Sequence, residues 1–265
     1  LVCDLPRGLL IKQALVQFVR RKRELRVKVP YSSKTCLLGR SDSVQPCLSS
    51  SSPCDSVIPW EPASSTCDGK SLSEMLSRLG FVVLDDLLPT AACKAFATQV
   101  HDWYRSGELA KGLVGDVALP TLAGDKRGDY IKHIAKGTHD TLDEIIDKLD
   151  DLFLKLQTWI PEFSNVSIRT QAMVAVYPPG ARYVKHLDNP GDDREDRRRF
   201  TMVYYLNYEW PDDAGGHLRL YNEDESSSID IAPLGGRLVA FRADRIPHEV
   251  MPARMERAAV SVWFA

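Results

Sequence analysis

The sequence predicts an α+β fold that is mainly β, with an antiparallel double sheet that follows a group of helices. From Ile168 to the C-terminal end, short segments of strand character alternate with turn-rich joints. Such a series is typical of sandwiches and barrels built from antiparallel strands. The helical patterns come before this part of the chain, and helices grouped ahead of strands argue against alternating βαβ units.

Three helices are expected ahead of the double sheet. A short helix at 71–78 ends at Gly80, before a strand at 81–85, and a second helix begins at Pro89. A third helix at 140–159 has a wide apolar stripe, formed by Leu142, Ile145, Ile146, Leu149, Leu152, Phe153 and Leu156. Because such a stripe has to be buried, we expect these helices to cover one face of the sheet.

Eight strands are expected in the second half of the chain. Each is rich in apolar, β-branched or aromatic residues and is bounded by residues that favour turns. They lie at 169–177, 183–187, 199–207, 216–222, 228–233, 236–243, 248–253 and 258–265. The core of the double sheet is therefore expected within this part of the chain.

The chain is expected to divide at residue 70. Its 265 residues suffice for one large domain and an additional segment. Residues 8–29 are basic and apolar, and residues 41–66 are rich in Ser, Pro and Cys. The second composition buries too little apolar area to offset the entropy of ordering. We expect residues 1–69 to hold a basic helix and a disordered linker, and residues 70–265 to form the folded domain.

Composition argues against two classes of partner. The formal net charge of −2 gives no overall attraction to nucleic acid or to an anionic membrane, and we expect neither as a partner. The basic cluster 20–23 could be a nuclear signal or a membrane-surface patch, but a solvated helix face is the preferred interpretation. Free thiols in a reducing compartment are preferred over a zinc site at Cys47, Cys54 and Cys67, because these cysteines lack paired spacing.

Four residues have the order and spacing of a non-haem iron site. His186 and Asp188 are two residues apart, so they lie on the same side of an extended strand, and His248 follows on a later strand. Two imidazoles and one carboxylate on one side of iron leave positions open for a cosubstrate and O2. Arg257, nine residues beyond His248, can bind a carboxylate through two parallel hydrogen bonds. Each histidine alone could be structural, whereas the set favours the iron site.

Several segments resemble the oxygen-sensing prolyl hydroxylases, which include the hypoxia-inducible-factor hydroxylases and protist relatives that modify a ubiquitin-ligase adaptor. The resemblance runs from about residue 72 to the C-terminal end, and it is carried by HLDNP (186–190), RFTMVYYLNYEW (199–210), GGHLRL (215–220) and PHEVMPARMERAAVSVWF (247–264). It implies a double-stranded β-helix, or jelly roll, flanked by N-terminal helices. Residues 70–265 would then be a dioxygenase catalytic domain that uses Fe(II), 2-oxoglutarate and O2, with ascorbate as reductant.

The same resemblance implies the first set of site residues. His186, Asp188 and His248 would bind iron, and Arg257 would bind the distal carboxylate of 2-oxoglutarate. Tyr177 matches a tyrosine that hydrogen-bonds the cosubstrate near the metal. The enzyme is expected to be a monomer, in the cytoplasm, the nucleus or both, and to act on a proline-containing protein.

Five further residues are implied around the cosubstrate. Tyr205 matches a tyrosine that reaches the distal carboxylate, and Leu218 and Val250 match apolar walls of the pocket. Ser261 stands where the family has a threonine. Trp263 matches an aromatic residue that packs beside the bound substrate and cosubstrate.

Three residues are expected on the substrate side. Arg127 and Asp129 match a segment that leads out of a loop closing over the substrate, expected at 116–126 with Gly124 as a hinge. Arg198 falls where the family has an arginine at the site entrance. We expect an Asp129–Arg198 ion pair that positions the loop, with a solvated charge run around Arg198 as the alternative.

Alternatives to this function remain open in the sequence. One residue is missing between Tyr177 and His186 relative to the family, and the segment before His248 is short. Both departures leave the substrate undecided between an oxygen-sensing factor and a ubiquitin-ligase adaptor. A small-molecule oxygenase of the same chemistry is a further alternative. A non-catalytic binding protein is less favoured, because it predicts the loss of a metal ligand or of Arg257, and all four residues are present. A zinc hydrolase is less favoured because Arg257 would then have no role.

Overall fold

The computed structural model describes residues 60–114, 121–122, 126–191 and 198–265. The described residues all belong to one compact unit, Pro53–Ala265. The helix expected at 8–29, and most of the loop expected at 116–126 with its Gly124 hinge, lie outside the described residues. In the described part of the chain, no helix is long and apolar enough to cross a membrane.

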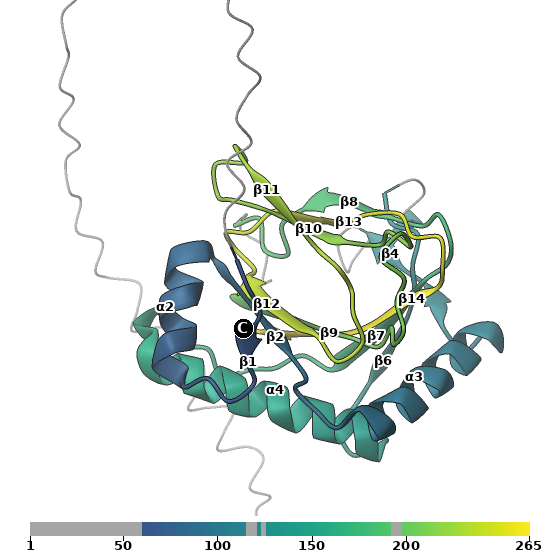
Figure 1. Ribbon diagram of the computed structural model, residues 1–265, viewed down its shortest axis with the longest axis horizontal. Coiled ribbons are helices and arrows are strands. Elements are labelled where there is room, and N and C mark those ends of the chain that lie inside the picture. Colours follow the sequence, from purple (N-terminus) through teal and green to yellow (C-terminus); the bar gives the residue numbers. More distant parts are fainter. Residues whose placement is uncertain (1–59, 115–120, 123–125, 192–197) are drawn as a thin grey trace, which may run out of the picture. The chain divides into compact units, whose positions relative to one another are not determined.

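Two facing sheets form the domain. The larger has the order β1 (Ala63–Ser64), β2 (Phe81–Asp85), β12 (Leu238–Arg242), β9 (Phe200–Tyr205), β14 (Arg257–Phe264), β7 (Ala172–Tyr177), β6 (Tyr130–Ile134) and β3 (Ala110–Lys111). The smaller has the order β11 (Ser228–Ile231), β10 (Leu218–Tyr221), β13 (His248–Val250) and β8 (Tyr183–His186). A separate ribbon pairs β4 (Leu113–Val114) with β5 (Thr121–Leu122). In Figure 1 the smaller sheet lies opposite the larger one, which confirms the predicted jelly roll.

Three helices cover the outer face of the larger sheet, as predicted (Figure 1). They are α2 (Gly69–Leu79), α3 (Thr90–Arg105) and α4 (Asp140–Trp159), and a 3₁₀ turn, η1 (Pro161–Phe163), follows α4. Asp68 caps α2 by accepting a hydrogen bond from a first-turn amide. Gly80 ends α2 with a φ of 77°, a left-handed conformation that favours glycine.

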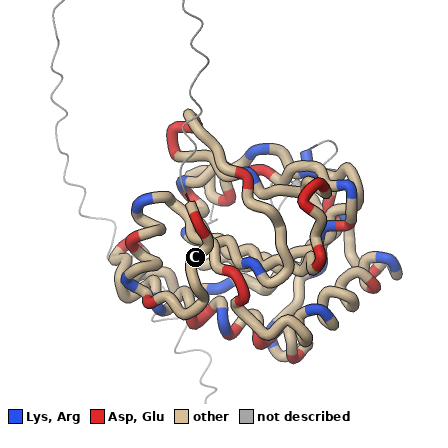
Figure 2. Tube along the Cα trace, viewed as in Figure 1, with Lys and Arg blue, Asp and Glu red and all other residues tan. Residues whose placement is uncertain are grey.

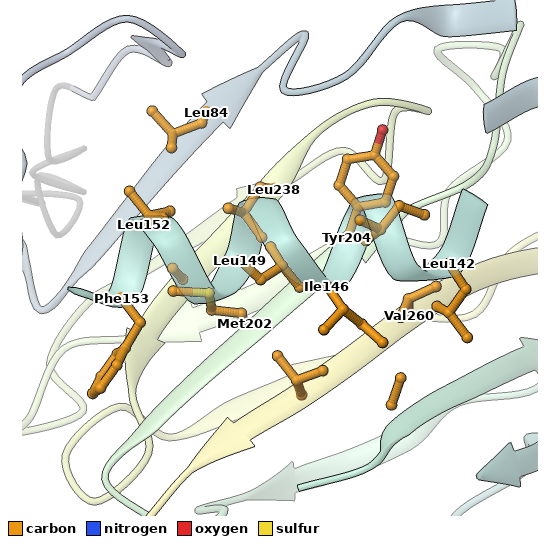
Figure 3. Packing of buried hydrophobic residues seen from close by; sticks show 14 of the residues in the cluster. Leu84, Leu142, Ile146, Leu149, Leu152, Phe153, Met202, Tyr204, Leu238 and Val260 are labelled. Carbon is orange, nitrogen blue, oxygen red and sulfur yellow. The ribbon is translucent and has the colours of Figure 1, made fainter. Parts of the chain in front are cut away.

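Helix α4 fastens the helical layer to the sheet. Its seven predicted stripe residues are all buried, and Figure 3 shows several of them directed at side chains of the larger sheet such as Met202, Leu238 and Val260. Each such side chain stabilises the fold by about 1.5–3 kcal/mol when it is fully buried. The apolar stripe therefore gives the sheet a rigid backing behind the cavity described below.

Strand β14 is almost wholly buried because each of its faces packs against a different layer. Ala258, Val260, Val262 and Phe264 belong to the core that faces the helices, whereas Ala259 belongs to the core between the sheets. Figure 2 shows acidic and basic residues interspersed along the helices and loops. The central strands β7, β9, β12 and β14 carry charge only at the end of β12 and the start of β14. Arg257, at the start of β14, therefore stands out as a charged residue of a central strand, and burying a charge is costly unless it serves a partner or ligand.

A short strand lies ahead of residue 70, where the sequence predicts that the folded domain begins. Strand β1 pairs in parallel with β2, and the ring of Trp60 contacts that of Phe81 edge to face, with centroids 6.5 Å apart. Two residues of the expected linker, Ala63 and Ser64, are thus in the larger sheet. The sequence did not indicate this strand, because two residues leave no periodic pattern.

Candidate active site

A cavity of about 730 Å³ opens between the two sheets. It contains eleven of the thirteen residues that the sequence nominated: Tyr177, His186, Asp188, Leu218, His248, Val250, Arg257, Ser261, Trp263, Arg127 and Arg198. The two others lie directly behind the lining, Tyr205 against Arg257 and Asp129 against Arg127. The fold thus brings the nominated residues together.

The three nominated metal ligands converge at one point of the cavity. His186 on β8 and His248 on β13 are register partners across the smaller sheet, and Asp188 lies two residues beyond the end of β8. Nε2 of His186 lies 3.6 Å from Oδ1 of Asp188, and Nε2 of His248 lies 3.8 Å from Oδ2. One ligand atom from each residue lies within 4.8 Å of the other two. This separation suits donors that share one metal ion.

Backbone carbonyls orient both imidazoles. Nδ1 of His186 lies 2.9 Å from the Val184 carbonyl oxygen, and Nδ1 of His248 lies 3.1 Å from that of Ile246. A carbonyl only accepts hydrogen bonds, so each Nδ1 carries the proton and each Nε2 keeps its lone pair for a metal. The ring of Tyr183 stacks on that of His186, with centroids 3.8 Å apart.

Two donors fix the carboxylate of Asp188. Its Oδ2 accepts hydrogen bonds from the Thr201 hydroxyl (2.7 Å) and from the indole N–H of Trp263 (2.9 Å). Burial raises the pKa of this carboxyl, but the two imidazoles and the Thr201 hydroxyl lower it by more, so the group is ionised. Burial lowers the pKa of His248 to about 4. At neutral pH the site thus holds a carboxylate and a neutral His248, as metal binding requires.

Arg257 is a buried charge without a counter-ion. Its side chain is 2% exposed, and among the described residues no carboxylate forms an ion pair with it. Its Nε donates to the Gly216 carbonyl (2.8 Å) and one terminal nitrogen donates to the Tyr205 hydroxyl (3.2 Å). A buried guanidinium that has only neutral acceptors is costly. This end of the cavity is therefore suited to an anion, and a carboxylate matches the planar guanidinium.

The nominated pocket walls surround the space between Arg257 and the three ligands. Tyr177 on β7 is the register partner of Arg257 on β14, and burial raises the pKa of its hydroxyl well above the ordinary value, so that it remains a donor. Leu218 and Val250 are register partners on β10 and β13 and form an apolar wall on the smaller sheet. Ser261 lines the same cavity from β14.

The substrate side differs from the sequence prediction. Both carboxylate oxygens of Asp129 accept hydrogen bonds from Arg127, at 2.6 and 2.9 Å, and Asp129 is 0% exposed. The guanidinium of Arg198 instead lies over the Trp263 ring, 4.7 Å from its centroid. In this structure Asp129 is thus paired with Arg127, and the Asp129–Arg198 pair that the sequence predicted for the substrate loop is not formed between these two described residues.

Comparison with known proteins identifies the family. A model of the 2OG-Fe(II) oxygenase superfamily matches residues 172–265. The mouse protein named Prolyl hydroxylase EGLN3 is 33% identical over 196 residues, which cover 71% of this chain and 80% of that protein. The chain belongs to the prolyl hydroxylase family of 2OG-Fe(II) oxygenases. It spans about half the length of Egl nine homolog 1 from mouse, rat and human.

Two solved structures share the prolyl hydroxylase fold with this chain. A Pseudomonas putida prolyl-4-hydroxylase is 32% identical with a TM-score of 0.64, and the match covers 74% of this chain and 97% of that one. A prolyl hydroxylase from Trichoplax adhaerens, solved with a peptide fragment of the hypoxia inducible factor oxygen degradation domain, is 30% identical with a TM-score of 0.63. That match covers 74% of this chain and 88% of that one.

Sequence reasoning missed two residues of this prolyl hydroxylase site. Thr201 holds Asp188, and Tyr183 stacks on His186. The sequence contained a sign of the role of Thr201, because this residue is polar in the otherwise apolar strand FTMVYY. Thr201 and Val203 are two residues apart, so they lie on the same face of the strand, and both line the cavity. Tyr183 had none, since its role depends on how β8 curves beside β13, where the register shifts.

Proposed function

We propose that this chain is an Fe(II)- and 2-oxoglutarate-dependent prolyl 4-hydroxylase that acts on a protein. The carrying observation is the unpaired, buried guanidinium of Arg257 in the same cavity as the convergent His186, Asp188 and His248. A metal site alone would suit many hydrolases. An anion site beside it suits a chelating dicarboxylate that reaches from the metal to the arginine.

The residues present fit Fe(II) and 2-oxoglutarate. His186, Asp188 and His248 would hold iron on one side, and Arg257 would hold the distal carboxylate of 2-oxoglutarate, with Tyr177 as a further donor. Iron and 2-oxoglutarate bound at these residues would supply the oxidation of a proline at C4 by O2, in which 2-oxoglutarate is converted to succinate and CO2 and takes up the second oxygen atom. Ascorbate would act as the reductant that maintains Fe(II).

The chain's own residues orient and shield this chemistry. The carbonyls of Val184 and Ile246 hold the imidazoles in the tautomer that binds metal. Thr201 and Trp263 engage Oδ2 of Asp188 and leave Oδ1 for the metal. The apolar wall and the sheet behind it limit the access of water to the metal.

A peptide substrate is supported by the lining of the cavity. Arg127, Lys132, His133 and Trp263 line it, so that charged and aromatic groups are available to an extended chain that carries a proline. The Trichoplax relative was solved with a hypoxia inducible factor peptide. We propose a protein of that type as substrate, in oxygen sensing. We also propose that the protein is a monomer and that it lies in the cytoplasm, the nucleus or both.

The test measures 2-oxoglutarate turnover with and without peptide. The Fe(II)-loaded protein is incubated with a hypoxia-inducible-factor peptide, with the same peptide carrying Ala in place of Pro, and with a ubiquitin-ligase adaptor peptide. Peptide-dependent succinate release with one added oxygen atom on proline is expected. Asp188→Ala should abolish it. Arg257→Lys should raise the KM for 2-oxoglutarate by about 10- to 150-fold, which corresponds to about 1.5–3 kcal/mol. Arg219→Lys, on the surface, should leave this KM unchanged.

Each result bears on a different part of the proposal. Turnover with the adaptor peptide alone would replace the substrate and keep the reaction. Turnover that no proline peptide stimulates would overturn the prolyl hydroxylase assignment. An unchanged KM in Arg257→Lys would show that Arg257 does not bind the distal carboxylate.

A further inference from the structure

We propose that Trp210 is a positioning residue for Arg257, and that it thereby sets the preference for a 2-oxo dicarboxylate over a 2-oxo monocarboxylate. This inference rests on the proposed function, since it concerns the same cosubstrate. Trp210 lies outside the cavity that holds the metal ligands and lines a neighbouring one of about 480 Å³. It therefore acts through the backbone that holds Arg257, without touching the cosubstrate.

That backbone is a turn of two glycines. Gly215 and Gly216 have φ values of 73° and 72°, which favour glycine at both positions. The Gly216 amide donates to the Pro252 carbonyl at 2.9 Å, and Gly215 bridges to Ala253. This geometry directs the Gly216 carbonyl inward, where it accepts the hydrogen bond from Nε of Arg257 at 2.8 Å.

The indole of Trp210 fastens this turn. Its Nε1 donates to the Gly215 carbonyl at 3.1 Å. A Cβ atom on Gly216 would lie 3.1 Å from Cζ2 of Trp210, 3.3 Å from Cδ of Arg257 and 2.9 Å from the Cβ of Ala253. The indole, the glycine turn and the arginine stem therefore form one close-packed layer, with the Gly216 α-carbon between the two side chains.

The orientation of the guanidinium depends on this layer. The plane of the Arg257 guanidinium is set by two acceptors, the Gly216 carbonyl and the Tyr205 hydroxyl. If the turn moves, the hydrogen bond from Nε of Arg257 to Gly216 changes direction. The guanidinium then no longer presents two parallel N–H groups to a carboxylate, although its charge stays in place. The 2-oxo end would instead be held by the metal, whose ligands His186, Asp188 and His248 lie on or just beyond strands of the smaller sheet. Only ligands with a distal carboxylate should therefore respond.

The experiment compares 2-oxoglutarate with 2-oxobutyrate, which lacks the distal carboxylate. Calorimetric titration of the anaerobic Fe(II)-loaded protein gives Kd for both acids in wild type and in Trp210→Phe, which keeps a ring and removes the N–H donor. We expect the Kd of 2-oxoglutarate to rise about three- to tenfold, the scale of one net hydrogen bond. The Kd of 2-oxobutyrate should stay within about twofold, and so should the affinity for Fe(II).

Two further variants keep the outcome decisive. Trp159→Phe alters an indole that is 52% exposed on α4 and should leave both Kd values unchanged. Gly216→Ala should lower the preference further than Trp210→Phe, because the left-handed backbone and the close contacts both oppose a Cβ.

The failures of the two proposals are distinguishable. A wild-type protein that does not prefer 2-oxoglutarate over 2-oxobutyrate would overturn the proposed function and this inference with it. A wild-type preference that Trp210→Phe retains would overturn the inference alone. A parallel loss of affinity for both acids would also overturn it, because that pattern indicates a general structural role.

Discussion

Asp129→Asn should destabilise the protein by about 3–5 kcal/mol, the scale measured when one partner of a buried ion pair is removed. Asp129 is fully buried, and the side chain of Arg127 is 11% exposed. Asn keeps the shape of the side chain, but its amide group faces the N–H groups of Arg127 and its charge is gone. The guanidinium would then be buried without a counter-ion. It lies over the Tyr183 ring, 5.0 Å from the centroid, so no carboxylate replaces the lost one from that side.

A second pair provides a matched control. Arg219 and Asp230 form the same two-bond arrangement at 2.7 and 2.8 Å, but their side chains are 31% and 41% exposed. Water screens such a pair, so Asp230→Asn should cost about 0–1 kcal/mol. Urea unfolding of the metal-free protein measures both variants, with equal m-values as the check that each unfolds as wild type does. Similar losses in the two variants would refute the argument from burial.

The same pair should affect the metal site. Arg127 contacts Tyr183, whose ring stacks on His186, so Asp129→Asn should also weaken Fe(II) binding whereas Asp230→Asn should not. A double-mutant cycle between Asp129 and Arg127 should show strong coupling. A cycle between Asp129 and Arg198 should be additive in the protein without substrate, and coupling there would contradict the assignment of Asp129 to Arg127 alone.

Two further predictions concern the metal ligands. Thr201→Val removes the hydroxyl that donates to Asp188 at 2.7 Å and should lower Fe(II) affinity by about 10–100-fold in a metal titration. Thr201→Ser keeps a hydroxyl and should bind Fe(II) as the wild type does. Wild-type affinity in the valine variant would contradict the role of Thr201 in holding Asp188. In the metal-free protein the NMR titration of His248 should have its midpoint near pH 4. Because its folded pKa lies below the unfolded value of about 6.5, its contribution to stability is full above pH 6.5 and is lost as the pH falls toward 4. A midpoint at or above 6.5 would contradict this.

The parts of the fold that the sequence predicted are those with a long, uniform pattern. Both ends of helix α4 were predicted correctly, because its apolar stripe repeats with helical spacing along most of its 20 residues. Strands β7, β9 and β14 were found because they are buried almost throughout and are therefore rich in apolar residues along their whole length. Strand β6 was missed, because Lys132 and His133 interrupt its apolar pattern. Lys132 forms an ion pair with Glu108 and lies over the Trp103 ring.

The site shows the same division between local and non-local information. His186 and Asp188 could be nominated because residues two apart share one side of an extended chain. The same rule applied to Arg127 and Asp129 would have given the observed pair, which the family resemblance led us to assign to Arg198. The contact of Thr201 with Asp188 could not be derived, since it depends on which strand of the larger sheet lies beneath the end of β8.

The N-terminal boundary of the domain gives a last prediction. Trp60 packs on Phe81, and the guanidinium of Arg237 lies 6.0 Å from the centre of the Trp60 ring. Strand β1 covers the edge of β2 beyond them. Asp68 then caps α2 through a 2.9 Å bond to the Ser71 amide. A chain that starts at residue 60 keeps both features, one that starts at residue 68 keeps only the cap, and one that starts at residue 70 keeps neither.

Stability should therefore fall in two steps along this series. Loss of residues 60–67 uncovers Phe81 and the edge of β2, which should cost about 1–2 kcal/mol, the scale of an aromatic pair with a short strand contact. Loss of Asp68 should cost about 1 kcal/mol more, as for other helix caps. All three chains carry an acetylated N-terminus, so that no new positive charge lies at the start of α2. Urea unfolding measures the steps, and Asp68→Ala in the longest chain should reproduce the second step alone. If the chains starting at 60 and 68 are equally stable, β1 and Trp60 do not belong to the cooperative core, and the boundary at residue 70 was placed well enough.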